Sequence, residues 1–269
     1  MTDGNAMNVP ELADLESRPL TDKQLKDYVN DFRKFADRVA WLAGGGGDSA
    51  VLKRLIENTR AAVQVERPMG WRKQLARVDT AKGVRSEDRW ERTMWRKWRP
   101  FKGYMPVSEF HALAPKILSY QLPLYGKQAS EGWGKVDLVG ISRADLPVVI
   151  EVKAEDAKDS PIAVVLEAVR YGIALRELWN RGLREEWTGE LENLGIGPKE
   201  PLPLHLEQCQ LICAAPSEYW MSHGPTTSSG KADDKAWGSF RELCEKLAQE
   251  HCLPVEFVKL EFSATTLNL

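Results

Sequence analysis

The sequence has few of the residues that build disulfide-bonded, zinc-binding or membrane-spanning proteins. It contains four cysteines and four histidines in 269 residues, and no two cysteines have the CxxC spacing of metal and redox motifs. His251 beside Cys252 could bind a metal, although such a pair is commoner as packed or exposed side chains. No run of about 18 apolar residues is present, and the acidic first twenty residues lack the pattern of a secretion signal. We therefore expect a cytoplasmic protein with reduced thiols.

A large excess of charge of one sign is also missing. The formal net charge is -2, which by itself is not typical of a nucleic-acid-binding protein. The distribution is uneven, however. The segment from Arg67 to Lys102 holds twelve Lys/Arg and four acids, a local balance of +8, so the rest of the chain carries -10. Because binding depends on the local field, this segment is a candidate surface for a polyanion.

The first 85 residues are predicted to form a region of their own. Residues 1–20 are expected to be a flexible lead-in, and residues 21–85 a helical region with apolar positions at helical spacing in 21–43 and 50–65. The GGGG run at 44–47 follows a helix pattern and lacks a following Lys-Ser or Lys-Thr, so we predict a turn rather than a phosphate-binding loop. The apolar stripes of these helices could dock a second copy of the chain or a partner protein.

Residues 86–269 are predicted to be the main domain. Their patterns alternate between helical and strand periods, which favours an α/β fold with a mixed β-sheet flanked by helices. The expected elements are a helix at 86–98, strands at 116–126, 135–142 and 147–153, a helix at 160–182, a loop or insertion at 183–207, a strand at 209–216, a mobile loop at 222–234, a helix at 234–251 and a strand at 254–263.

Three charged residues interrupt the apolar strands of "VDLVGISRADLPVVIEVK". Asp137 lies in the second predicted strand, and Glu151 and Lys153 share one face of the third. An isolated buried charge costs several kcal/mol or is neutralised by a pKa shift, so these charges need compensation. Either Lys153 forms an ion pair with a carboxylate, or the two acids bind a hard cation. Mg²⁺ suits two carboxylates completed by waters and phosphate oxygens.

This stretch resembles the core motif of the PD-(D/E)XK nuclease superfamily, which has the restriction-endonuclease-like fold. Asp137 matches the first acid and Glu151-Val152-Lys153 the E-x-K, and the element order matches an αβββαβ core over roughly residues 86–263. The resemblance implies a metal-dependent deoxyribonuclease. Asp137 and Glu151 would hold Mg²⁺, with Mn²⁺ able to substitute and the Val152 carbonyl as a third ligand, and Lys153 would orient or activate water.

Two neighbouring helices extend the resemblance. The helix after the E-x-K strand reads "LEAVRYG", with Glu167 and Tyr171 at the spacing of the Q-x-x-x-Y motif in RecB-like and lambda-exonuclease-like members. Glutamate replaces glutamine here, and it could bind metal or position Lys153. Tyr171 could equally be a core residue, and Arg170 could contact a phosphate. Many members also supply a glutamate from the helix before the first strand. The candidates for this role are Glu91, Glu87 and Glu109.

The stretch "RTMWRKWRPFKGY" interleaves basic and aromatic side chains, a combination that suits nucleic acid. The alternative is a helix whose tryptophans are in the core and whose arginines are solvated; we expect the tryptophans in the core and leave both readings open for the arginines. The candidate nucleic-acid-binding residues are Arg92, Arg96, Lys97, Arg99, Lys102 and Arg170. Together with the basic stretch, the resemblance implies a DNA nuclease, and it is the resemblance alone that suggests a role in anti-phage defence. A non-cleaving nucleic-acid-binding or partner-dependent module on the same fold is the alternative.

Overall fold

The computed structural model describes residues 50–63, 86–98, 105, 115–123, 135–143, 146–193, 202–223 and 234–261. The predicted lead-in, the first helix at 21–43 and the GGGG turn lie outside these ranges. The helices are α4 (Ala50–Ala62), α5 (Ser86–Trp98), α6 (Pro161–Leu178), α7 (Arg184–Asn193), α8 (Ser217–His223) and α9 (Asp234–His251). The strands are β1 (Pro115–Pro123), β2 (Lys135–Ser142), β3 (Pro147–Val152), β4 (Gln210–Pro216) and β5 (Val255–Leu260).

The five strands form one mixed sheet in the order β1-β2-β3-β4-β5. The first three strands are antiparallel neighbours. Between β2 and β3 the connection, residues 143–146, is too short for the crossover that a parallel pair needs. β3, β4 and β5 are parallel, because the chain returns through α6 between β3 and β4 and through α9 between β4 and β5. The predicted α/β class with a mixed sheet is confirmed.

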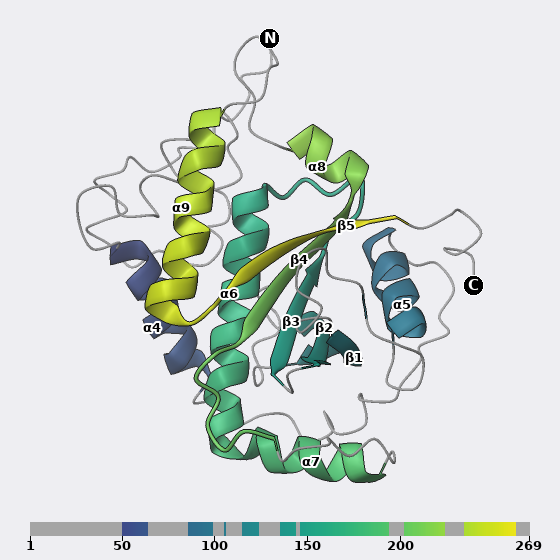
Figure 1. The fold of residues 1–269 in the computed structure, drawn as a ribbon, viewed down its shortest axis with the longest axis vertical. Coiled ribbons are helices and arrows are strands. Elements are labelled where there is room, and N and C mark those ends of the chain that lie inside the picture. Colours follow the sequence, from purple (N-terminus) through teal and green to yellow (C-terminus); the bar gives the residue numbers. More distant parts are fainter. Residues whose placement is uncertain are drawn as a thin grey trace, which may run out of the picture.

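Helices cover both faces of this sheet, with α6 and α9 on one side and α5 on the other (Figure 1). Val149 of β3 packs in the apolar cluster beneath α6 and α9, whereas Val148 and Ile150 pack in the cluster beneath α5. The strand thus alternates as predicted. Trp90 and Trp98 of α5 are buried in the second cluster, which confirms that these tryptophans belong to the core.

The α6 helix crosses from β3 to β4 through the protein interior. Ser160 caps its first turn, since the Ser160 hydroxyl accepts a hydrogen bond from the Ala163 N–H at 3.2 Å. Pro161 follows at the first helical position, where a missing N–H costs nothing. Most of α6 is buried, and α4 packs against it. Among the helices that the structure describes, none is long and apolar enough to cross a bilayer.

The prediction of a loop at 183–207 was wrong for its first half, which forms α7. After α6 the chain passes through a π-turn, where Gly182 adopts a φ of 103°, a conformation that favours glycine. The new helix then places Trp187 edge-on against Trp179 at 5.4 Å between ring centroids. The short helix α8 was also not predicted, and its last residues, Ser222 and His223, fall in the expected loop at 222–234.

Candidate metal site

The candidate site lies where β3 separates from β2. The two strands pair from Ile141 and Pro147 to Leu138 and Ile150. Pairing of β3 with β4 continues further, and the Lys153 N–H donates to the Ala214 carbonyl at 2.9 Å.

Asp137 occupies the opening between the diverging strands. Its Oδ2 accepts a hydrogen bond from the Val152 N–H at 2.8 Å. The carboxylate thus takes the place of the β2 carbonyl that would accept this bond if the two strands stayed paired. This contact fixes the Asp137 carboxylate beside the end of β3.

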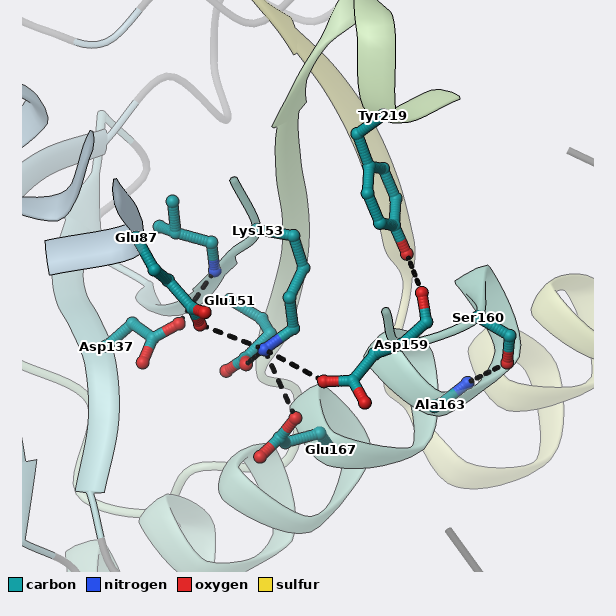
Figure 2. A network of polar contacts seen from close by, with 10 residues as sticks. Glu87, Asp137, Glu151, Lys153, Asp159, Ser160, Ala163, Glu167 and Tyr219 are labelled. Carbon is teal, nitrogen blue, oxygen red and sulfur yellow. Dashed lines mark hydrogen bonds and ion pairs between the residues drawn. The ribbon is translucent and has the colours of Figure 1, made fainter. Parts of the chain in front are cut away.

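Lys153 follows directly after β3, and its ammonium lies among four carboxylates (Figure 2). Lys153 Nζ donates hydrogen bonds to Glu151 Oε1 at 2.7 Å and to Glu87 Oε1 at 3.1 Å. Glu167 Oε2 lies 3.4 Å from Lys153 Nζ, and Asp159 Oδ2 lies at 3.8 Å. The four acids come from β3, α5, α6 and the connection that joins β3 to α6, so Lys153 links elements on both sides of the sheet.

A second group of carboxylates forms between α5 and β2. Glu87, Glu91 and Asp137 each offer one oxygen, and these oxygens all lie within 4.8 Å of one another. Glu87 and Glu91 are four residues apart, so they share one face of α5. Trp90, Met94 and Trp98 bury the adjoining face against the sheet, and this packing aims the two glutamates at Asp137. Oxygen ligands of this kind suit a hard divalent cation.

Six carboxylates and one ammonium therefore make up the site. Burial raises the pKa of Asp137 well above its usual value, and the charges of Glu91 and Glu87 raise it further against the opposing effect of Lys153. Burial likewise raises the pKa of Glu151, together with the charges of Asp137 and Glu167. A cation bound here would favour the ionised carboxylates.

Glu151 provides a further observation that fits a cation. Its side chain is only 1% exposed, and its Oε1 is bonded to Lys153. Its Oε2 is buried and has no hydrogen-bond partner within the part of the chain that the structure describes. A buried, unsatisfied carboxylate oxygen costs free energy, which a cation ligated at this point would recover. The Val152 carbonyl remains a predicted ligand.

Lys153 itself is 4% exposed. Burial acts to lower its pKa, but the surrounding carboxylates of Glu151, Glu167, Asp137 and Glu87 outweigh this effect and raise the pKa well above the usual value. The side chain is thus an ammonium in this arrangement, a hydrogen-bond donor rather than a base.

The structure places the predicted residues of α6 in different settings. Glu167 lies at Lys153, as described above, and is not part of the group formed by Glu87, Glu91 and Asp137. Tyr171 is buried in the core beneath α6. Burial, together with the charges of Glu151 and Glu167, raises its pKa. Arg170 is 6% exposed, and its contact with a phosphate remains a prediction.

The candidate nucleic-acid-binding residues of α5 lie at or near the surface. Arg92 and Arg96 are partly exposed and Lys97 is exposed; Lys97 Nζ lies 5.3 Å from the Trp98 ring centroid. Arg99, Lys102 and Glu109 lie outside the described ranges.

Two residues near the site were not singled out from the sequence. Asp159 contributes a carboxylate near Lys153, and Tyr219 of α8 donates from its hydroxyl to the Asp159 carbonyl at 2.7 Å. Asp159 directly precedes the Ser160-Pro161 helix start, a local signal that could have placed it near the end of β3. No local signal joins Tyr219 to Asp159, since they are 60 positions apart.

No protein-family model, curated protein or solved structure matches this chain in the comparisons with known proteins. The structure establishes an α/β protein with a possible acidic metal site beside a buried lysine.

Proposed function

We propose that this protein is a divalent-metal-dependent nuclease of the PD-(D/E)XK type that hydrolyses DNA phosphodiester bonds. One observation carries the proposal: the carboxylates of Glu87, Glu91 and Asp137 converge beside the buried Glu151–Lys153 pair. An acid on one strand and an E-x-K on the next are the parts of the superfamily motif, and many members also supply a glutamate from the preceding helix.

The carboxylates divide between two tasks in this proposal. Asp137 and Glu91 bind the cation, with Glu87 as an additional ligand and Glu151 contributing its unsatisfied Oε2. Glu167 and Asp159 hold the ammonium of Lys153 from the α6 side. Mg²⁺, or Mn²⁺ in its place, would polarise the phosphate and lower the pKa of a bound water.

Lys153 supplies positive charge and hydrogen-bond donors at the same point. An ammonium can hold an attacking water in position or stabilise the negative charge that builds on a phosphate oxygen. The raised pKa of Lys153 favours these roles over proton abstraction.

The basic residues of α5 support nucleic acid as the substrate. Arg92, Arg96 and Lys97 lie on the helix that also carries Glu87 and Glu91, so a phosphate backbone bound along α5 would pass close to the carboxylates. Contacts of this kind position a strand without reading its sequence.

A cleavage assay tests the proposal. Supercoiled plasmid, linear duplex and single-stranded DNA are incubated with the protein in Mg²⁺, Mn²⁺ or EDTA, beside Lys153→Ala and a control variant, Lys246→Ala. Lys246 contacts Glu250 on α9. We expect metal-dependent cleavage that Lys153→Ala abolishes and Lys246→Ala retains. An inert wild-type protein that still binds DNA would instead indicate the non-cleaving or partner-dependent module.

A further inference from the structure

The connection between β3 and α6, residues 153–160, is held by aromatic side chains from two distant elements. Trp90 Nε1 of α5 donates to Glu155 Oε2 at 2.8 Å, and the Tyr219 hydroxyl of α8 donates to the Asp159 carbonyl at 2.7 Å. The second contact differs from the first because it holds the main chain itself, one residue before the cap of α6.

Tyr219 is well suited to fix a backbone position. It is fully buried, its ring stacks on His223 at 4.6 Å between centroids, and Trp220 meets it edge-on at 5.0 Å. A ring packed on two sides has little freedom to move its hydroxyl. The hydrogen bond therefore connects the Asp159 carbonyl to α8. Because α8 begins directly after Pro216, the last residue of β4, the same bond also connects it to the end of β4.

The Asp159 side chain continues this chain of contacts to the candidate site. Its Oδ2 lies 3.8 Å from Lys153 Nζ, on the opposite side of the ammonium from Glu87 (Figure 2). We infer that Tyr219 is a positioning residue for Lys153: it fixes Asp159, whose carboxylate helps to hold the Lys153 ammonium among its partners. The effect on catalysis rests on the function proposed above, whereas the effect on the lysine does not.

The test compares Tyr219→Phe with Thr59→Val. The first variant keeps the ring and removes the hydroxyl. The second also removes one buried hydroxyl and keeps the shape of the side chain. The Thr59 hydroxyl donates to the Leu55 carbonyl of α4 at 2.7 Å, a contact that involves neither Tyr219 nor residues 153–160. The primary measurement is acylation of individual lysines by a water-soluble active ester at fixed pH without metal, quantified by mass spectrometry, with exposed Lys259 as the internal standard.

We expect acylation of Lys153 to rise about five-fold in Tyr219→Phe, the factor that corresponds to one hydrogen bond of ordinary net strength, and to stay at the wild-type level in Thr59→Val. Asp159→Asn tests the same link from its other end. The increase in Lys153 acylation caused by Asp159→Asn should not add to the increase caused by Tyr219→Phe in the double variant, because both changes break the same link from Tyr219 through Asp159 to Lys153. Acylation of Lys153 at the wild-type level in Tyr219→Phe, or an equal rise in Thr59→Val, would overturn the inference.

Kinetics supply the second readout. If the protein cleaves DNA, Tyr219→Phe should lower kcat and leave both the KM for DNA and the affinity for Mn²⁺ unchanged, since the proposed cation ligands come mainly from α5 and β2. A fall in Mn²⁺ affinity equal to the fall in kcat would contradict the positioning role. If the wild-type protein cleaves nothing, the proposed function fails, and the acylation measurement still decides whether Tyr219 positions Lys153.

Discussion

At the scale of single residues, the site combines charges that oppose one another. Asp137 is held near Glu91 and Glu87, and its raised pKa shows that its ionised form is disfavoured here. Residues that are arranged for chemistry rather than for stability often have this property. Substitution of Asp137 should therefore separate function from stability.

Asp137→Asn should lower metal-dependent cleavage by about 100-fold or more, because a ligand of a catalytic metal contributes several kcal/mol. The same change should leave the free energy of unfolding in EDTA unchanged or raise it by about 1 kcal/mol, because the repulsion from Glu91 and Glu87 is removed. The asparagine oxygen can still accept from the Val152 N–H. Urea denaturation and the cleavage assay measure the two effects, and a large loss of stability would contradict this reasoning.

The Glu151–Lys153 pair should behave as a buried ion pair. Lys153→Met leaves Glu151 without its bonded partner and should lower the free energy of unfolding by about 3 kcal/mol. Adding Glu151→Gln to that variant should recover much of the loss, since no ionised carboxylate then remains at this position. A double-mutant cycle followed by urea denaturation measures the coupling, and additive losses would show that the two side chains act independently.

At the scale of elements, α6 must approach the sheet closely to bring Glu167 to Lys153. Gly172 of α6 allows this approach: a Cβ added there would lie 2.6 Å from Leu211 Cδ2 and 3.1 Å from Leu253 Cδ2. Both leucines are fully buried, so they have little space into which to move.

Gly172→Ala should therefore destabilise the protein although alanine favours helix by about 1 kcal/mol. Overpacking a filled core costs about 1–3 kcal/mol, so we expect a net loss of about 1 kcal/mol. Gly189→Ala in α7 is the matched control, because an added Cβ would meet nothing within 4 Å, and it should be neutral or stabilising. Thermal denaturation compares the two, and a stabilised Gly172→Ala would show that α6 can shift away from the sheet.

At the scale of the whole molecule, the parts that local patterns determine were predicted well. β2 was predicted with its observed limits, and the ends of α5, β3 and α9 were predicted to within a residue, because apolar periodicity is a local signal. The helix α7 was missed because its stability depends on Trp187 reaching Trp179, a contact across a kink. Glu91 and Glu87 were candidates for the site because of the resemblance, and the structure brings both to Asp137. That both reach it depends on how α5 lies against the sheet, and no spacing in the sequence encodes that angle.

The last prediction concerns the stability of the whole molecule, which we expect a divalent cation to raise. The converging oxygens of Glu87, Glu91 and Asp137 come from two elements that only the fold brings together, so Mg²⁺ or Mn²⁺ should bind the native state in preference to the unfolded chain. A concentration 100 times the Kd should then add about 2.7 kcal/mol to the free energy of unfolding. Thermal denaturation should show a rise in Tm with each cation that EDTA reverses. Glu91→Gln should lose the rise, whereas Glu185→Gln, at an exposed acid on α7, should retain it. An equal rise in both variants would mean that the cation binds elsewhere on the protein, and the proposed ligand set would be wrong.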